Sequence, residues 1–309
     1  MKKRFGDRRD AYRVRDVHGM QYIMNDFFKT RNEAIVYMNA KIDVTNFVKY
    51  IDNLKKEHPD VTYFHGMVDI LAHAVYSRPY LNRFVANRKI WEHKDVSFGS
   101  TIKAEFEDKS EECIMVMKVL PEWTLLDLSK SIKEKVNKIR NNQSADIDGV
   151  VEFVGHLPNP LRIPIVGFLK FLDRHGWLPK SLMDDNLYYA TAIVSDIGVF
   201  KTGAIYHHLV DFGTNSMVVT FGEIKKESDG RSYMEFGATI DERIADGFYL
   251  CKALKLIEYI YAHPELLLEP AGKHVHMPVE EKKDKKEEKK VEKKKENNKE
   301  KDKEEIDIV

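Results

Sequence analysis

The order in which two apolar periodicities follow each other restricts what this chain can fold into. Residues 33–44, EAIVYMNAKIDV, alternate and are rich in β-formers, which predicts a strand. From Phe47 to Leu54 the apolar residues recur at helical spacing instead, and Asp43 or Thr45 can cap that helix. Further helices are predicted at 64–77, 124–142, 146–175 and 246–262, and further strands within 77–106 and at 112–120, 187–198, 216–224 and 232–240. Because strands and helices do not alternate regularly, this order predicts an α+β domain in which helices pack on a mixed, mainly antiparallel sheet.

The composition changes abruptly after Met277. Between Glu280 and Asp307 the chain consists almost entirely of Lys, Glu, Asp and Asn, whereas the whole chain is 43% hydrophobic and 11% aromatic. A segment with almost nothing apolar to bury cannot offset the entropy that it loses on ordering. We therefore predict one folded domain over residues 1–277 and a disordered Lys/Glu-rich tail over 278–309, which should be dispensable for folding.

The charges argue against nucleic acid as a partner. Lys and Arg number 50, as do Asp and Glu, so the formal net charge is +0, whereas a nucleic-acid-binding domain usually carries a basic surplus. A local basic surplus occurs between Lys2 and Arg15. There a solvated face is favoured over a binding arm.

Cysteine spacing and hydropathy give further limits. Cys113 and Cys251 lie far apart and form neither a metal-binding spacing nor a disulfide framework. No apolar run approaches the roughly 18 residues of a membrane-spanning helix, and we predict a cytoplasmic protein without a metal. Residues 157–179, LPNPLRIPIVGFLKFLDRHGWLP, are unusually apolar. Burial beneath the sheet is favoured for this segment over contact with a membrane or a partner.

Three separated stretches resemble, in order and spacing, one superfamily of enzymes. Residues 41–82, KIDVTNFVKYIDNLKKEHPDVTYFHGMVDILAHAVYSRPYLN, resemble the strand and two helices near the start of chloramphenicol acetyltransferase and of the dihydrolipoyl acyltransferase catalytic domain of 2-oxoacid dehydrogenase complexes. AIVSDIG, residues 192–198, is similar to a strand end of the latter. ERIADG, residues 242–247, is similar to the H-x-x-x-D-G motif of both. The resemblance covers about residues 15–265 and implies the two-layer fold of these enzymes.

The same resemblance implies a mechanism. The motif histidine, which corresponds to Glu242 here, is the general base that takes a proton from an acceptor hydroxyl or thiol, so that the acceptor attacks an acyl thioester of coenzyme A. Ser195 would donate a hydrogen bond to the tetrahedral oxyanion. Asp246 would pair with an arginine of the N-terminal segment. A homotrimer with active sites between subunits is also implied.

The sequence departs from this pattern at two positions. Glu242 stands where the base would be a histidine, and Gln21, within HGMQYIMN, stands at the arginine position. The lipoyl and subunit-binding domains of a dehydrogenase acyltransferase have no counterpart in these residues, so no covalent lipoyl group is expected.

Two roles are open for Glu242. A carboxylate is a weaker base than an imidazole at neutral pH, although burial recruits carboxylates for such work. An ion pair with Arg243 beside a helix start is the slightly favoured alternative. His207 and His208, in GAIYHHLVDFG, offer a substitute base. Adjacent strand residues point to opposite faces, so at most one of them would serve, and packing roles are favoured for both.

The leading hypothesis is therefore an acyltransferase that moves an acyl group from coenzyme A to a small acceptor. Ser195 would be the oxyanion donor, and Glu242 or His208 the base. The residues that bind coenzyme A are not identified by the sequence. The alternative is a catalytically silent trimer that keeps the fold as a binding or assembly module.

Overall fold

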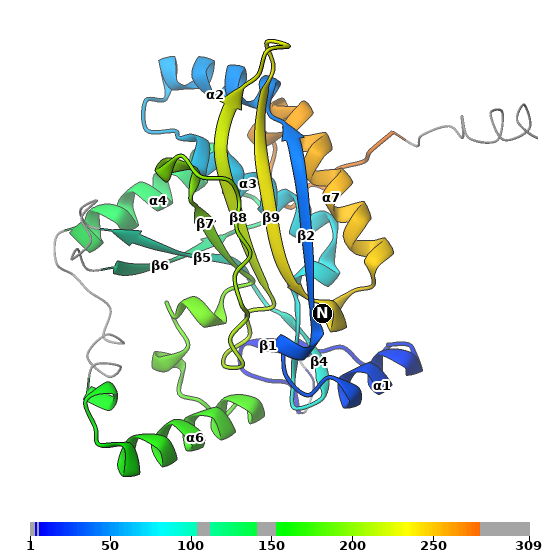
Figure 1. Cartoon of the computed structure of the whole chain (residues 1–309), viewed down its shortest axis with the longest axis vertical. Coiled ribbons are helices and arrows are strands. Elements are labelled where there is room, and N and C mark those ends of the chain that lie inside the picture. The colour runs from blue at the N-terminus through cyan, green and yellow to red at the C-terminus, as the bar shows by residue number, and fades with distance from the viewer. Residues whose placement is uncertain (1–3, 5, 104–111, 141–152, 279–309) are drawn as a thin grey trace, which may run out of the picture. The chain divides into compact units, whose positions relative to one another are not determined.

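One large sheet forms the centre of the domain (Figure 1). The computed structural model describes residue 4 and residues 6–103, 112–140 and 153–278, and Met1–Val275 forms one compact unit. The sheet has the order β2 (Ile35–Asp43), β9 (Ser232–Asp241), β8 (Met217–Lys226), β7 (Ala192–Asp196), β5 (Val96–Lys103) and β6 (Glu112–Val119). Strand β7 is parallel to both β5 and β8, and the other neighbours are antiparallel. The predicted α+β class with a mixed, mainly antiparallel sheet is confirmed.

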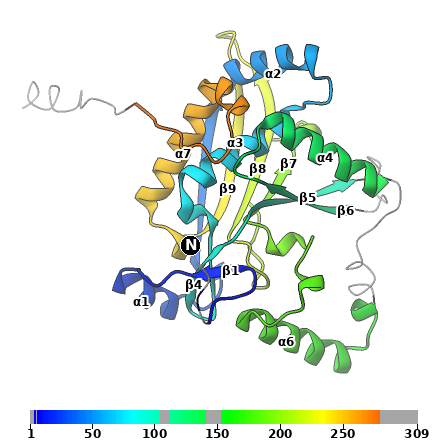
Figure 2. The ribbon, with the colours of Figure 1, turned by 180° about the vertical axis from the view of Figure 1, so that it is seen from behind.

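Three helices cover one face of this sheet, as Figure 2 shows from behind. They are α2 (Thr45–Glu57), α3 (Tyr63–Ser77) and α7 (Gly247–Ala262). Phe47 and Ile51 of α2 are fully buried, which confirms the predicted apolar stripe. Helix α3 begins where the Thr62 hydroxyl accepts a hydrogen bond from the His65 amide, and nearly all of its residues are buried. Burial of these helix faces against the sheet supplies the main apolar core.

The remaining elements lie around the large sheet. Helix α4 (Leu125–Arg140) packs against α3 and β6. A second sheet has the order β1 (Ala11–Arg13), β4 (Lys89–His93) and β3 (Arg83–Ala86), and α1 (Gly19–Phe27) follows β1 in the chain. Helix α6 (Asn159–His175) leads through short 3-10 turns to β7. Of the predicted helix 146–175, residues 146–152 lie outside the described part, and α6 itself begins only after Pro158. The predicted tail, 278–309, lies almost entirely outside the described residues.

The long strands β8 and β9 have one apolar and one polar face. Val219 and Ala238 lie with side chains of α3 and α7 around an apolar core cavity. Thr220 and Thr239 are neighbours of these residues in the chain and therefore point to the opposite face. Both threonines are buried, with exposed fractions of 2% and 0%. The opposite face is therefore polar and covered by another part of the chain.

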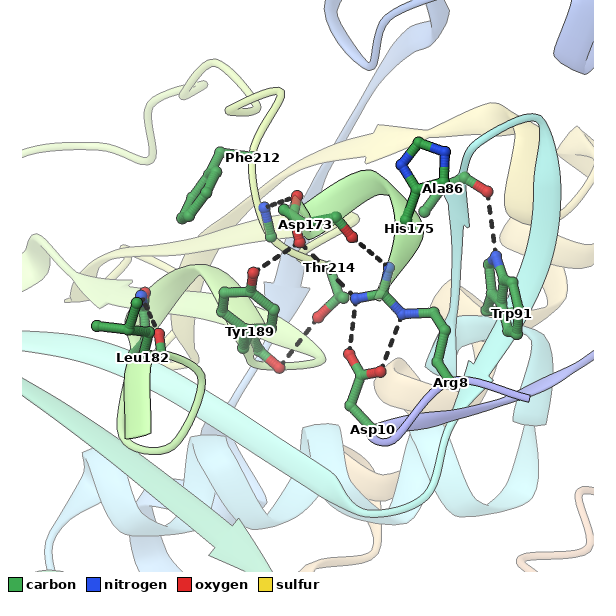
Figure 3. Close-up of polar contacts among 12 residues, drawn as sticks. Arg8, Asp10, Ala86, Trp91, Asp173, His175, Leu182, Tyr189, Phe212 and Thr214 are labelled. Carbon is green, nitrogen blue, oxygen red and sulfur yellow. Dashed lines mark hydrogen bonds and ion pairs between the residues drawn. The ribbon is translucent and has the colours of Figure 1, made fainter. Parts of the chain in front are cut away.

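A network of buried charges ties the start of the chain to the end of α6 (Figure 3). The Arg8 guanidinium donates two hydrogen bonds to Asp10, 2.9 and 3.0 Å long, and a third of 2.7 Å to the carbonyl of Asp173. The Asp173 carboxylate accepts hydrogen bonds from the Tyr189 hydroxyl at 2.6 Å and the Gly213 amide at 2.9 Å. Burial opposes the charge of Arg8, but the bonds to Asp10 more than offset this, so the pKa of Arg8 is raised.

This network corrects the prediction of a solvated face for one member of the basic N-terminal cluster, whereas Arg4, Arg9 and Arg15 are exposed as predicted. Arg8 is 4% exposed and pairs with acids, so it is part of the core rather than of a solvated face. Gly213 completes the network in the left-handed region, with φ of 73°. A Cβ atom at this position would lie 2.3 Å from the carbonyl oxygen of Tyr188, so glycine is required there.

Helix α6 corrects a second prediction, that residues 157–179 are buried beneath the sheet. Leu169 and Leu172 pack against the small cluster of Leu178, Met183 and Tyr189. Most of the other apolar side chains of α6 are exposed. The ion pair between Arg8 and Asp173 holds only the C-terminal end of the helix against the body of the domain.

Three histidines are buried without a negative charge in direct hydrogen-bonded contact. Burial lowers the pKa of His65, His73 and His93 to about 4 in each case. In the unfolded chain they titrate near 6.5. Between these values the unfolded chain binds more protons than the folded one, so stability rises with pH and is lost as the pH falls from 6.5 toward 4. Burial raises the pKa of the Asp69 carboxyl, which lies 3.7 Å from His73. This group contributes the opposite trend, a stability that falls as the pH rises.

We therefore expect the free energy of unfolding to fall by several kcal/mol between pH 6.5 and 4, since lowering a pKa by one unit on folding corresponds to about 1.4 kcal/mol. His65→Gln should flatten this dependence, because glutamine does not titrate and can still hydrogen-bond Ser129, which lies 2.9 Å from the ring of His65. His58→Gln, at an exposed position, is the control and should leave the slope unchanged. Urea unfolding at a series of pH values measures the slope. Equal slopes for the wild type and His65→Gln would contradict the contribution of His65 to the pH dependence of stability.

Candidate active site

Ser195 lies on the polar face of the large sheet, at the C-terminal end of β7. It pairs in register with Thr220 of β8 and is half-buried. No hydrogen bond to its hydroxyl is found among the described residues. The next residue, Asp196, accepts a hydrogen bond of 3.1 Å from the Gly198 amide, as is usual for an aspartate in a turn. A Cβ atom at Gly198 would lie 2.5 Å from the carbonyl oxygen of Gly222, so the turn closes tightly against β8.

Residues 203–209, which we call the histidine segment, cover this polar face. The Thr220 hydroxyl donates a hydrogen bond of 2.6 Å to the carbonyl of Ile205. The Thr239 hydroxyl accepts one of 3.2 Å from the His207 amide. The two buried threonines thereby fix the backbone of the segment over β8 and β9. Leu209, with an exposed fraction of 0%, anchors its end.

The two histidines of this segment do not alternate across a sheet. Residues 203–209 have no strand structure, and the rings of His207 and His208 stack 4.4 Å apart with both side chains exposed. The expectation that they point to opposite faces is therefore wrong, because it assumed an extended strand.

The contact of His207 with the following carbonyl decides which of its nitrogens carries the proton. Its Nδ1 atom lies 2.9 Å from the carbonyl oxygen of His208. A carbonyl can only accept a hydrogen bond, so Nδ1 must donate. In the neutral ring Nε2 then carries the lone pair and can accept a proton. No such contact orients the ring of His208 among the described residues.

Glu242 begins a short 3-10 helix, Glu242–Ile244, directly after β9 and is half-buried. Its expected ion pair with Arg243 is not formed. The Arg243 guanidinium is 2.8 Å from Oδ1 and 2.7 Å from Oδ2 of Asp241, and it also donates to the carbonyl of Phe28 at 2.7 Å. Among the described residues the Glu242 carboxylate has no ionic partner. Its backbone is held in place by the pair formed between the residues on either side of it.

Asp246 caps α7 rather than binding an arginine. Its side chain accepts a hydrogen bond of 2.7 Å from the Tyr249 amide, and it is exposed. Gln21 lies in α1. No bond between Gln21 and Asp246 is found in the described part of the chain. The arginine–aspartate pair of this loop is instead Arg243 with Asp241.

Strand geometry places the candidate residues at different distances from Ser195. Ser195 is in register with Thr220, and Thr220 with Gly237 of β9. With about 4.8 Å between strands and 3.3 Å per residue, the backbone of Ser195 lies about 12 Å from Thr239, beside which His207 is bound. By the same spacing it lies about 19 Å from Glu242. Within one chain, Ser195 and Glu242 therefore cannot act on the same atom, whereas the backbone position that holds His207 is about 7 Å nearer to Ser195.

A polar cavity of about 290 Å³ lies farther along the same face. His93, Ser97 and Lys118 line it, and the Nε2 atom of His93 has no hydrogen-bond partner. The cavity suits a small polar molecule. It begins about 14 Å from Ser195 along the sheet, too far for a molecule there to share a reacting atom with the serine. Among the described residues, no group of three or more His, Cys, Asp or Glu side chains is arranged to hold a metal ion.

Several residues that organise the site carry no local signal in the sequence. Arg31 is 3% exposed and donates to the carbonyls of Val210 and Gly213, just after the histidine segment. Its partners lie 179 and 182 positions away, so no local pattern reveals them. The Asp241–Arg243 pair could have been found, because the two residues lie two positions apart where a strand ends.

Comparisons with known proteins agree with this architecture. No family model and no curated protein matches the chain. Among solved structures, a probable dihydrolipoamide acetyltransferase from Listeria monocytogenes matches with a TM-score of 0.53 and 19% identity, over 82% of this chain and 95% of that one. The truncated catalytic core of a 2-oxoacid dehydrogenase complex from Thermoplasma acidophilum has the same TM-score of 0.53 and 16% identity, over 82% and 99%.

The chain has the dihydrolipoamide acetyltransferase core fold. This confirms the fold that the three sequence stretches predicted. A third neighbour is the dihydrolipoamide acetyltransferase of Azotobacter vinelandii, with a TM-score of 0.53 and 14% identity, over 82% of this chain and 94% of that one. A serine, a histidine and an asparagine have been investigated for their role in its catalytic mechanism, the last two being four residues apart. At these identities the likeness concerns the fold.

In the part of the chain that the structure describes, no helix is long and apolar enough to cross a lipid bilayer.

Proposed function

We propose that this protein transfers an acyl group from a coenzyme A thioester to a small hydroxyl- or thiol-bearing acceptor. The observation that carries the proposal is the polar sheet face, where the hydroxyl of Ser195 lies on the same side of β7–β9 as the backbone segment that carries His207. In the Azotobacter neighbour a serine and a histidine are studied for the catalytic mechanism. Here Glu242 stands four residues before Asp246, and His207 supplies the imidazole from another direction.

The chemistry follows from the two groups. Nε2 of His207 takes the proton from the acceptor, and the freed oxygen or sulfur attacks the thioester carbonyl. The tetrahedral oxyanion accepts a hydrogen bond from Ser195. When the intermediate collapses, the bond to sulfur breaks and the imidazolium returns its proton to the thiolate of coenzyme A. His207 is favoured over His208 because its Nδ1 atom is held by a carbonyl oxygen.

The arrangement between copies is also part of the proposal. We infer a homotrimer, since the neighbours include catalytic cores of multienzyme complexes. Glu242 lies about 19 Å from Ser195 within one chain, so it can serve as the base only if it reaches Ser195 of another copy. Glu242 is thus the second candidate base, and its lack of an ionic partner among the described residues supports this role.

The test is release of the coenzyme A thiol from acetyl-, propionyl- and butyryl-coenzyme A with a panel of small alcohols and thiols. Ser195→Ala should lower turnover about 100- to 1,000-fold, the usual effect of removing an oxyanion donor. His207→Gln should lower it about 100-fold or more.

His208→Gln is the matched control, because it keeps the carbonyl that orients His207, and it should have little effect. If Glu242→Gln abolishes turnover while His207→Gln does not, the base is Glu242. If the assembled wild type releases no thiol from any thioester, acyl transfer is overturned and the silent binding module becomes the better description.

A further inference from the structure

The exposed side of α6 is the largest apolar feature that the proposed reaction does not use. Figures 1 and 2 show α6 apart from the large sheet. Only Leu169 and Leu172 face the body of the domain as part of a cluster. We define the α6 surface as six exposed apolar side chains: Leu161, Ile163, Ile165, Phe168, Phe171 and Trp177. Four of them are 56–66% exposed. A surface of this kind marks an interaction site.

The helical spacing places basic groups beside this apolar surface. At 3.6 residues per turn, Leu161, Phe168 and Phe171 project within an arc of about 80°. Lys170 and Arg174 project within about 40° of each other on the adjoining side. The exposed side of the helix thus carries an arc of aromatic and aliphatic groups beside a basic side, on which the exposed Ile163 projects between the two cations.

The charge of the segment has one predominant sign. Residues 159–183 contain four cations and a single acid, Asp173, although Lys180 pairs at 3.6 Å with Asp184 just beyond this range. That acid is 5% exposed and is already bound by Arg8 and Tyr189. Arg174 contacts Asp211 at 3.0 Å, but its side chain remains 56% exposed. What the segment presents outward is apolar and basic, and such a surface complements a layer of anionic headgroups above hydrocarbon.

The aromatic end of the helix fits the same partner. The Trp177 ring is 60% exposed and lies 6.0 Å from the Phe171 ring and 4.8 Å from the His175 ring. Tryptophan is enriched where headgroups meet hydrocarbon. The charged network at Asp173 fixes this end of α6 to the domain, so the surface is presented by a rigid element.

From these observations we propose that α6 docks this protein onto anionic phospholipid bilayers. The helix lies in the interface with Phe168 and Phe171 inserted among the acyl chains, while Lys170 and Arg174 contact phosphate groups. The described helices are too short or too polar to cross the bilayer, so the contact that they make is peripheral. This inference does not depend on the proposed reaction.

Flotation of the full chain with vesicles tests it. Binding should be at least about tenfold tighter to phosphatidylcholine vesicles that contain phosphatidylglycerol than to pure phosphatidylcholine, because basic groups near an anionic surface are attracted to it. High salt should weaken binding. Trp177 fluorescence should shift to the blue on binding. Trp177→Phe should remove that shift without abolishing flotation.

Two pairs of variants distinguish vesicle binding through the α6 surface from nonspecific adsorption. The double variant Leu161→Ser, Phe168→Ser should lose vesicle binding by about tenfold or more, because both side chains lie on the apolar arc. Phe27→Ser, which alters a comparably exposed side chain on α1, should bind as the wild type does. Lys170→Glu should weaken binding, whereas Lys49→Glu on α2 should not.

Three results would overturn the proposal. They are equal binding by the wild type and the Leu161→Ser, Phe168→Ser variant, equal affinity for neutral and anionic vesicles, and no vesicle binding at all. In the last case, light scattering shows whether the double variant breaks the assembly. A smaller mass would identify the α6 surface as a contact between copies of this chain.

Discussion

Replacing Asp173 by asparagine is expected to lower the free energy of unfolding by about 3–5 kcal/mol, the usual cost of removing one partner from a buried ion pair. The Asp173 side chain is 6% exposed and lies 3.7 Å from the Arg8 guanidinium. It also accepts hydrogen bonds from Tyr189 and Gly213. Asparagine keeps the shape but removes the charge, and its amide group places a donor against another donor.

Chemical unfolding followed by circular dichroism measures this effect. Asp184→Asn, at an exposed position nearby, is the control and should cost less than about 0.5 kcal/mol. Tyr189→Phe removes a single hydrogen bond from the same carboxylate and should cost about 1–3 kcal/mol. An unchanged midpoint for Asp173→Asn would show that Asp10 alone compensates the charge of Arg8.

The elements of this fold are predictable because their signals are local. Most of the alternating stretch 33–44 lies in one strand, β2, although residues 33 and 34 belong to a short 3-10 helix before it. The helical spacing from Phe47 to Leu54 reflects burial of one side of α2. Both patterns are read without knowledge of the neighbours. The prediction is wrong for α6, where an apolar composition indicates burial although most of the apolar side chains are exposed.

The site is less predictable because its contacts are distant in sequence. Arg8 meets Asp173 across 165 positions, and Arg31 meets Gly213 across 182. Ser195 is recognisable because it lies at a characteristic strand end. The choice between the two histidines depends on one contact of His207 with a backbone carbonyl, and periodicity carries no information about such a contact. The position of the Glu242 carboxylate depends in turn on whether Arg243 forms its ion pair with Asp241 or with Glu242.

The pairing of Arg243 with Asp241 should also have a large effect on the free energy of unfolding. Asp241 is 0% exposed and binds Arg243 through both carboxylate oxygens, and the nearby Arg31 is also attracted to it. Asp241→Asn should therefore leave the buried guanidinium of Arg243 without a contacting acid, weaken the attraction on Arg31, and lower the free energy of unfolding by about 3–5 kcal/mol.

Arg243→Met should also destabilise the protein, because it leaves the Asp241 carboxylate buried without its cation. The double variant should cost less than the sum of the two single variants by about 1–3 kcal/mol, since neither partner then remains unpaired. Urea unfolding of the four proteins completes the cycle. Strict additivity of the two stability changes would mean that the Asp241–Arg243 pair contributes nothing to the loop that carries Glu242.

The same four proteins test the site, because Glu242 lies between the two partners in the chain. If Glu242 of a neighbouring copy is the base, the double variant should lose thioester turnover even where it remains folded, since the pair no longer holds the loop in place. If His207 is the base, turnover should follow the folded fraction alone, because the bond from the His207 amide to Thr239 does not involve the pair. The thiol-release assay, run at a denaturant concentration where each protein is fully folded, separates the two outcomes.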